Sequence, residues 1–224
     1  MKRLWQAIRY NIKRVMDSDP AADSVWMVLW TYPHITALFW HFFAHRLYKR
    51  GYKLLARRIA LHSRRVTGIE IHPGATIGRG LFIDHGIGVV IGETAIVGDD
   101  VTLFHGVTLG GMSSKKVKRH PTVGNDVLIG AGTKVLGDIT VGDHSRIGCN
   151  LVIKRDVPAN VVIYETEPEN VVSRRHKPTI HLIDGNGHSN QNQREGHSGT
   201  GRHVPRHRIA FTPKNMTKEM AWYI

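Results

Sequence analysis

A six-residue spacing of aliphatic side chains is the strongest constraint on what this chain can fold into. The spacing runs through three groups: Ile71, Ile77 and Ile83; Ile91, Val97, Leu103 and Leu109; then Val123, Ile129, Val135, Val141, Ile147 and Ile153. Hexapeptide periodicity predicts a parallel β-helix, in which three short strands and their turns close a coil of about 18 residues around stacked aliphatic side chains. An ordinary α-helix is excluded because glycine is too frequent in the same segment.

Two steps break this spacing. From Ile83 to Ile91 the step is eight residues, so we expect two extra residues in one turn. From Leu109 to Val123 it is fourteen, which we interpret as two repeats plus two residues, with a looped-out segment around Lys115. With that segment looped out, the repeats supply about four to five coils.

Charge divides the 224 residues into three zones. Residues 1–66 carry a net charge of +10, residues 67–172 carry −3 and residues 173–224 carry +6, for a total of +13. We predict an α-helical N-terminal domain, a left-handed β-helix and a mostly disordered basic tail, respectively. The positive charge would permit nucleic-acid binding, but solvated helix faces explain it more simply, so we expect no nucleic-acid partner.

The N-terminal zone reads as four helices. An apolar stripe predicts a helix over residues 2–16, and Pro20 suits the first turn of a second helix capped by Asp19 or Ser18. Two more helices are predicted over residues 33–50 and around residues 54–61. The apolar stretch within 25–43 is interrupted by polar residues, so we expect a buried helical pair and no membrane span.

Cysteine content and the N-terminus bear on location. The single cysteine, Cys149, excludes an internal disulfide framework and a cysteine metal cluster, and it is typical of a cytoplasmic protein. We interpret Cys149 as a core residue. No apolar run follows the basic N-terminus, so we expect no cleaved signal peptide.

The interior of such a coil is too narrow for a ligand, so any chemistry must lie outside it. We expect a groove between neighbouring prisms, hence a homo-oligomer of three-fold symmetry. The candidate side chains cluster in the repeat zone: Glu70, His72, Asp84, His85, Glu93, His105, Arg119 and His120. Asp84 could simply bond turn amides and His85 could be a satisfied turn residue. Because the pair replaces a repeat glycine, we favour a histidine–carboxylate pair that includes Glu70.

Together these residues resemble the serine O-acetyltransferases, a family of hexapeptide-repeat acyltransferases. The motifs that carry the resemblance are Ile71-His72-Pro73-Gly74-Ala75, Ile77-Gly78-Arg79-Gly80, Asp84-His85-Gly86, Val90-Ile91-Gly92-Glu93-Thr94-Ala95, Val107-Thr108-Leu109-Gly110-Gly111, Arg119-His120-Pro121 and Asp19-Pro20-Ala21-Ala22-Asp23. The resemblance covers roughly residues 1–158. It implies acetyl transfer from acetyl-CoA to the hydroxyl of L-serine, giving O-acetyl-L-serine for cysteine biosynthesis.

The resemblance also implies roles for particular residues. His85 would be the general base, partnered by Glu70, at a position where the family often has aspartate. Serine-binding positions are matched by Asp19, Asp84, Glu93, Arg119 and His120, and positions that line the CoA channel by Gly110, Gly111 and Ala131. No metal is expected.

The chemistry of these residue types supports the same roles independently of the resemblance. A serine hydroxyl is a poor nucleophile at neutral pH and needs a positioned base, for which histidine is suited. A carboxylate on the other ring nitrogen would set the tautomer, and arginine and aspartate complement the charges of an amino acid. The donor that stabilises the developing oxyanion stays open between repeat amides and His120.

Beyond residue 158 the resemblance weakens, and residues 184–208 have the composition of a disordered segment. The resemblance implies that the C-terminal Ile224 inserts into the active site of O-acetylserine sulfhydrylase. It further implies feedback inhibition by L-cysteine, and assembly as a homotrimer or a dimer of trimers.

Three alternatives stay open at this point. The chain could be another hexapeptide acyltransferase that acts on a sugar or antibiotic hydroxyl. It could be a zinc hydratase that resembles γ-class carbonic anhydrase, with His85, His105 and His120 as ligands. It could also be a non-catalytic partner of the sulfhydrylase, bound through its tail.

Overall fold

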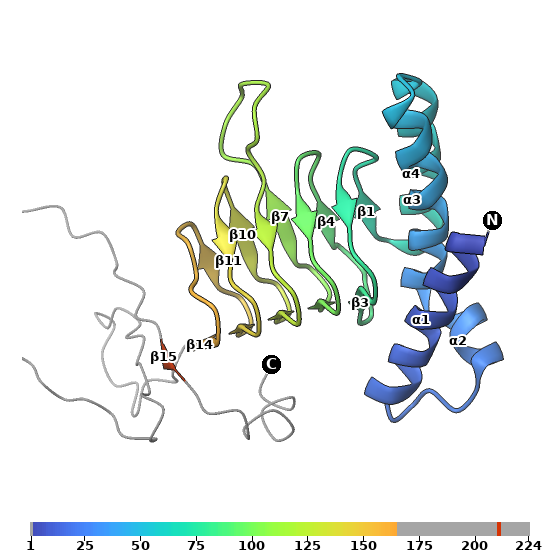
Figure 1. The fold of residues 1–224 in the computed structure, drawn as a ribbon, viewed down its shortest axis with the longest axis horizontal. Helices are drawn as coiled ribbons and strands as arrows, with labels where there is room; N and C mark the ends of the chain where they lie inside the picture. The colour runs from blue at the N-terminus through green and yellow to red at the C-terminus, as the bar shows by residue number, and fades with distance from the viewer. Residues whose placement is uncertain (1, 165–209, 212–224) are drawn as a thin grey trace, which may run out of the picture.

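The computed structural model describes residues 2–164 and 210–211, and it stacks a helical layer on one end of a β-helix (Figure 1). The helices are α1 (Lys2–Ser18), α2 (Val25–Thr31), α3 (Pro33–Lys49) and α4 (Lys53–Thr67). The last helix ends at Gly68, whose φ of 72° suits glycine, and the chain then enters the first strand. None of the helices in the described residues combines the length and apolarity needed to cross a bilayer.

The second helix begins later than the sequence predicted. Pro20 does not start it, because residues 19–24 form a turn in which Asp19 accepts two hydrogen bonds. Its carboxylate accepts from the Ala21 amide at 2.8 Å, and its carbonyl accepts from the Ala22 amide at 3.0 Å. The cap of α2 is Ser24, whose hydroxyl accepts from the Met27 amide at 3.2 Å. The Asp19 side chain therefore stabilises a turn in place of the expected helix start.

The β-helix consists of strands of two or three residues each. They are β1 (Glu70–Ile71), β2 (Thr76–Ile77), β3 (Phe82–Ile83), β4 (Val90–Ile91), β5 (Ile96–Val97), β6 (Thr102–Leu103), β7 (Thr108–Gly110), β8 (Thr122–Val123), β9 (Leu128–Ile129), β10 (Lys134–Leu136), β11 (Thr140–Val141), β12 (Arg146–Ile147), β13 (Val152–Ile153) and β14 (Val161–Ile163). A further strand, β15 (Ala210–Phe211), pairs antiparallel with β14 and lies within the predicted tail. The other residues of that tail, Ile224 included, lie outside the described residues.

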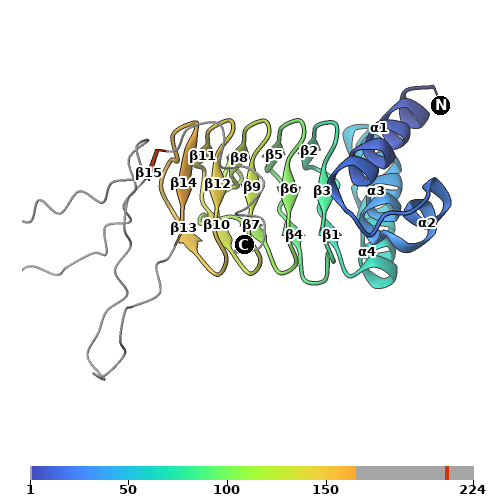
Figure 2. The same ribbon diagram turned by 90° about the horizontal axis from the view of Figure 1, so that it is seen from below.

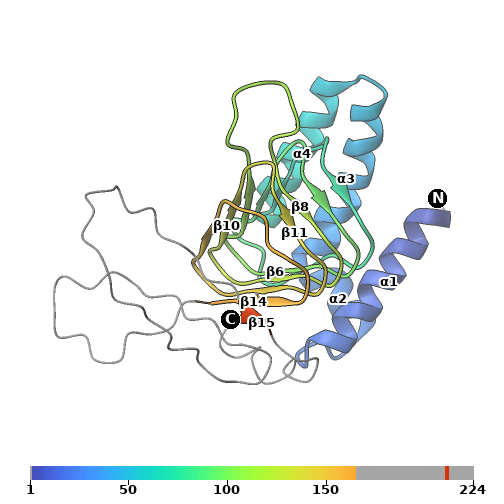
Figure 3. The same ribbon diagram turned by 60° about the vertical axis from the view of Figure 1, so that its left-hand side comes forward.

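Three parallel sheets form the sides of a triangular coil, as the oblique view along its axis shows (Figure 3). The first sheet has the order β1-β4-β7-β10-β13, the second β2-β5-β8-β11, and the third β3-β6-β9-β12-β14. Figure 2 shows the strands of the third sheet side by side along the coil. Residues on neighbouring coils pair in register, for example Ile71 with Ile91 and Ile91 with Leu109. The side chains of the six-residue positions form one continuous core, in which all but the partly buried Ile77 are buried, and this confirms the predicted fold class.

The eight-residue step from Ile83 to Ile91 is a turn with two extra residues, as predicted. The turn joins the third sheet to the first. The Gly88 amide donates to the Gly68 carbonyl, and the Gly106 amide donates to the Ile87 carbonyl, so Gly88 stacks on Gly106. The regular backbone pattern thus resumes at Ile87, and the extra residues are left outside it.

The fourteen-residue step differs from the prediction. Leu109 lies on β7 of the first sheet and Val123 on β8 of the second, which is the next face of the coil. The step is therefore one repeat with a long insertion and not two repeats plus two residues. The insertion projects as a loop from the corner between these two sheets (Figure 1). Spacing alone does not reveal which face the chain reaches next, so the count was wrong.

The helical layer contacts the coil through polar and apolar side chains. Arg14 of α1 donates to the Gly80 carbonyl and to the Thr102 hydroxyl, the latter at 2.9 Å. Beside these contacts, Phe82 of β3 packs into an apolar cluster with residues of α1, α2 and α3. The first coil and the helices therefore form one packed unit. The packing between them determines which helical residues lie near the corners of the coil.

His34 of α3 is buried at this junction, between the rings of Tyr32 and Phe82. Neither ring nitrogen of His34 has a hydrogen-bond partner within the described residues. Burial, assisted by the nearby charge of Arg14, lowers the pKa of His34 to about 3. An unfolded histidine titrates near 6.5, so between these two values the unfolded state binds more protons than the folded state.

We therefore expect His34 to make the protein less stable as the pH falls below about 6.5. At pH 5 this single group should lower the free energy of unfolding by about 2 kcal/mol relative to pH 8. Replacement His34→Phe should remove that part of the pH dependence, as measured by urea unfolding at both pH values. The exposed His62→Gln variant serves as the control and should retain the wild-type dependence; an unchanged slope in His34→Phe would contradict the assignment.

Candidate active site

The two extra residues place His85 on an outward turn at the corner between the third and first sheets, here named the His85 corner. The Gly86 amide donates to the Asp84 carbonyl at 2.6 Å, and His85 between them has a φ of 57°. A three-residue turn with a positive φ at its centre is rare and strained for a residue other than glycine. Its side chain is 74% exposed. The backbone thus holds an imidazole outside the coil, where it can meet a substrate.

Asp84 and His105 are the neighbours of the His85 ring. The Nε2 atom of His85 lies 3.6 Å from Oδ2 of Asp84, which is an ion-pair distance but longer than a hydrogen bond. The ring of His105, one coil further on, lies edge-on with its centroid 6.0 Å away. The structure therefore brings together a histidine and an acid, as expected, but the acid is the adjacent Asp84.

Glu70 makes a different contact from the one expected. Its Oε2 atom accepts a hydrogen bond from Nη1 of Arg64 at 2.9 Å, and among the described residues it forms no ion pair with His85. The reason is local, because Arg64 lies in the last turn of α4, directly before the strand that carries Glu70. In this chain the predicted pairing of Glu70 with His85 is replaced by a pairing with the helical layer.

Asp19 of the helical layer contacts a tyrosine of the same layer. Oδ2 of Asp19 accepts a hydrogen bond from the Tyr32 hydroxyl at 2.6 Å. Burial first, and then this hydrogen bond, raise the pKa of Tyr32 to about 12, and the charge of Asp84 adds to the effect. Tyr32 therefore links α3 to the turn that carries Asp19, and that Asp19 and Asp84 act in one site stays a prediction. Tyr32 was missed, since no motif links it to the acid that it contacts.

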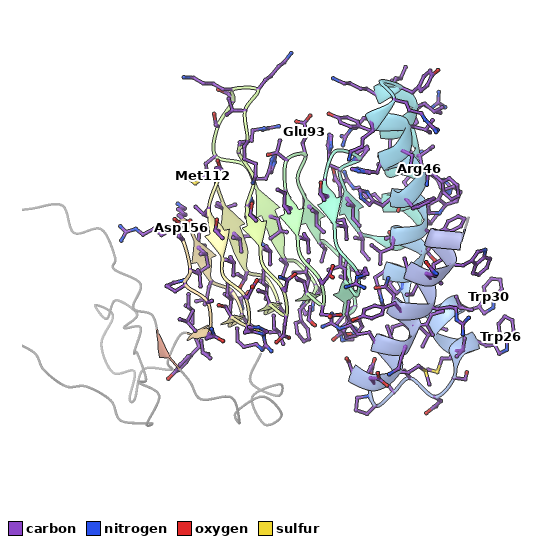
Figure 4. All side chains as sticks on the ribbon, viewed as in Figure 1. Trp26, Trp30, Arg46, Glu93, Met112 and Asp156 are labelled. Atoms are coloured by element: carbon purple, nitrogen blue, oxygen red, sulfur yellow. The ribbon has the colours of Figure 1, made fainter. Side chains whose placement is uncertain are left out.

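A second group of residues lies at the corner between the first and second sheets, here named the loop corner. The Tyr48 hydroxyl donates to Oε1 of Glu93 at 2.7 Å, and Arg119 donates to Oε2 at 3.2 Å. These contacts, chiefly the Tyr48 hydrogen bond, hold the pKa of Glu93 below its usual value. Figure 4 shows Glu93 at the edge of the coil from which the loop with Met112 rises. Glu93 is thus an ionised acid that orients the Arg119 guanidinium.

His120 is the buried member of the loop corner. Its Nδ1 atom lies 2.9 Å from the Thr94 hydroxyl and accepts from the Thr94 amide at 3.2 Å. A side chain at Gly92 would collide with the ring, since a Cβ there would lie 1.9 Å from Cδ2 of His120. Burial first, and then the charge of Arg119, lower the pKa of His120. The ring is therefore held neutral in a slot that requires glycine. Thr94 was not predicted, although it lies within a motif that carried the resemblance.

The predicted CoA-channel positions divide between the two corners. Gly110 and Gly111 lie at the base of the loop, and a Cβ on Gly111 would lie 3.2 Å from Nε2 of His120. Ala131 lies on the His85 corner, where the Gly132 amide bonds to the His105 carbonyl at 2.9 Å. The Asn150 amide donates in turn to the Ala131 carbonyl at 2.7 Å. Cys149, which precedes Asn150, is therefore the equivalent corner residue on the next coil, and the three residues form one column along the corner.

Cys149 is half-buried on this corner. The interpretation of Cys149 as a core residue is therefore corrected: it belongs to a turn, because the inward position of its repeat is taken by Ile147. Among residues 2–164 and 210–211, no group of three or more histidine, cysteine or acidic side chains is arranged to hold a metal ion.

The predicted site residues thus form two groups on one chain. His85, Asp84 and Ala131 belong to the His85 corner, Glu93, Arg119, His120, Gly110 and Gly111 belong to the loop corner, and Asp19 lies in the helical layer. The whole width of the first sheet separates the two corners. One corner thus presents an imidazole and a carboxylate, and the other presents a guanidinium with a neutral histidine.

Known proteins share both the sequence and the fold. The bacterial transferase hexapeptide family (six repeats) matches residues 120–155. The chain is 58% identical over 151 residues to a serine acetyltransferase of Helicobacter pylori strain J99, which covers 67% of this chain and 88% of that protein. It is 55% identical over 154 residues to the serine acetyltransferase of Bacillus subtilis strain 168, covering 69% and 71% respectively.

Solved structures give the same result. A serine acetyltransferase of Neisseria gonorrhoeae in complex with serine superposes with a TM-score of 0.70 and 36% identity, over 74% of this chain and 68% of that one. Serine acetyltransferase isoform 3 of Entamoeba histolytica in complex with cysteine gives a TM-score of 0.72 and 40% identity, over 77% and 62%. The likeness therefore extends over the helical layer and the coil together.

Proposed function

Because the chain belongs to the serine acetyltransferase family, we propose that it transfers the acetyl group of acetyl-CoA to the hydroxyl of L-serine. The products are O-acetyl-L-serine, a precursor for cysteine biosynthesis, and free CoA. The observation that carries the proposal is the exposed imidazole of His85, held beside a carboxylate on a strained turn.

His85 acts as the general base in this proposal. Its ring takes the proton of the serine hydroxyl as the oxygen attacks the thioester carbonyl. The tetrahedral intermediate then collapses, the C–S bond breaks, and the CoA thiolate leaves and takes up the proton from His85. No covalent enzyme intermediate is needed, since serine itself is the nucleophile. Acetyl-CoA is a co-substrate, and the chemistry of these residues calls for no metal.

Substrate binding draws on the charges at both corners. Arg119 complements the carboxylate of serine, and Asp19 and Asp84 complement its ammonium group. Glu93 orients the guanidinium of Arg119, as its 3.2 Å contact supports. The thioester arm of acetyl-CoA lies along Ala131 on one side and along Gly110 and Gly111 on the other, where small residues leave room.

The division into two corners supports a site shared between protomers. The His85 corner of one prism and the loop corner of its neighbour complete each other when three prisms pack side by side around a three-fold axis. We therefore propose a homotrimer with three such sites. A dimer of trimers, formed through the helical layers, is the larger assembly that the resemblance implies.

Regulation and partners follow from the same proposal. L-cysteine differs from L-serine only at the side-chain atom, so it competes for the serine site and inhibits. The C-terminal Ile224, outside the described residues, binds the active site of O-acetylserine sulfhydrylase, with its terminal carboxylate captured by backbone amides. The cytoplasm is the proposed location.

Replacement His85→Ala tests the assignment of the base. The rate of acetyl transfer to L-serine should fall by about 10²–10⁴-fold, the usual contribution of general acid–base catalysis, with the oligomer intact. The assay measures CoA release with L-serine and with a panel of sugar and antibiotic hydroxyls, and His144→Ala at a remote corner is the control. An unaltered rate in His85→Ala would show that His85 is not the general base. Equal turnover of L-serine and of the sugar or antibiotic hydroxyls would indicate that serine is not the specific acceptor.

Two amide variants separate the candidate partners of His85. If Asp84 orients the imidazole and holds the serine ammonium, Asp84→Asn should lower kcat/KM by about 10²-fold or more. Glu70→Gln should then cost less than about tenfold, because its carboxylate pairs with Arg64. A larger loss in Glu70→Gln would show instead that Glu70 leaves Arg64 and orients the base during catalysis. Steady-state kinetics of both variants give the answer.

Mixed oligomers test the shared site. The variants His85→Ala and Arg119→Ala should each be nearly inactive alone. Co-expressed in equal amounts with two different affinity tags and purified through both, they should recover about a third of wild-type activity, because one of the three sites in each mixed trimer has both native residues. Absence of recovery in doubly purified mixed trimers would place both residues in the site of a single chain.

A further inference from the structure

Four hydrogen bonds centre on Thr94, three through its hydroxyl and one through its backbone amide, between the coil and the end of the loop. The amides of Arg119 and His120 both donate to the Thr94 hydroxyl oxygen, at 3.0 and 3.1 Å. The hydroxyl lies 2.9 Å from Nδ1 of the His120 ring, and the Thr94 amide donates to the same atom at 3.2 Å. Thr94 therefore contacts both the backbone and the ring of the segment that carries two of the proposed serine ligands.

Proton counting on these bonds determines the tautomer of His120. The Thr94 oxygen already accepts two amide hydrogens, so its single hydrogen is the one directed to Nδ1. The Thr94 amide also donates to Nδ1, so this atom receives hydrogens from two donors and can carry none of its own. The proton of the neutral ring must then be on Nε2.

The opposite edge of the ring is free to meet a ligand. Nε2 lies beside Gly92 and Gly111, since a Cβ on either glycine would approach it to 2.1 and 3.2 Å. Within the described residues Nε2 has no protein partner, and it is not among the buried polar atoms left unpaired, so it reaches the surface. Nε2 thus presents a hydrogen-bond donor at the base of the loop, and the Cγ atom of Arg119 lies beside the same glycine, Gly111.

We propose that Thr94 is a positioning residue that holds His120 as a neutral Nε2–H donor to the carboxylate of bound serine, and aligns the backbone of Arg119 beside it. This inference rests on the proposed function. A donor on a neutral ring recognises a carboxylate oxygen by geometry, while Arg119 supplies the charge. Thr94 itself touches no substrate, and it acts only through the two residues that it holds.

Replacement Thr94→Val tests the proposal, because valine keeps the shape of threonine and removes the hydroxyl. The amides of Arg119 and His120 then lose their acceptor, and the ring is free to shift its proton to Nδ1 or to turn. The KM for L-serine should rise by about tenfold or more, while kcat and the KM for acetyl-CoA change by less than about threefold. Thr94→Ser keeps the hydroxyl and should restore the serine KM to within about threefold of wild type.

Thr140→Val, at an exposed strand position on the second sheet, is the matched control and should change neither KM. A wild-type serine KM in Thr94→Val would overturn the proposal. So would failure of Thr94→Ser to restore it. If wild-type protein showed no transfer to serine at all, the proposed function would fail, and the tautomer of His120 would still be measurable.

Nitrogen-15 NMR of histidine-labelled protein provides that measurement, with the His120 signals assigned from a His120→Gln variant. Wild-type His120 should show an unprotonated Nδ1 and a protonated Nε2, and Thr94→Val should show a mixture of the two tautomers. A protonated Nδ1 in the wild-type protein would overturn the proposal even if Thr94→Val failed to fold.

Discussion

Register between stacked coils is the constraint on which the rest of the structure depends. Each short strand forms backbone hydrogen bonds with the equivalent strands of adjacent coils, and this pairing places the aliphatic positions in one buried column after another. Because every residue then has a fixed face, a corner position on one coil lies directly over the same position on the next. His105, Ala131 and Cys149 illustrate this, as their neighbouring amides and carbonyls join them into one column.

The chemistry lies where the regular coil is interrupted. Two additional residues at one corner force His85 outward on a turn that has a positive φ. A longer insertion at another corner carries Arg119 and His120 back onto the coil, where Gly92 leaves space for a ring. In both places the stable stack on either side supports a local conformation that a short turn by itself would not hold.

Separation of the two corners relates the fold to its assembly. The first sheet lies between His85 and Arg119, so in the proposed mechanism one prism provides two different half-sites. Packing of identical prisms around an axis would join unlike half-sites and would make oligomer formation a requirement for catalysis. The helical layer packs on the first coil through Phe82 and Arg14, and within that layer Tyr32 holds the Asp19 carboxylate.

The sequence by itself determined the fold class, the core positions and the turn that carries His85, because the period of six and its first interruption are local properties that can be read along the chain. Its resemblance to a family also predicted which acids, histidines and arginine form the site. Only the tertiary structure decided which of them touch. Glu70 pairs with Arg64, Thr94 holds His120, and Tyr48 binds Glu93. The tertiary structure likewise decided that the long insertion leads from the first sheet to the second, which is the next face of the coil, without an additional repeat. These contacts join segments that are distant in sequence, or involve side chains that compete for one partner. They therefore depend on distances and burial in the folded chain.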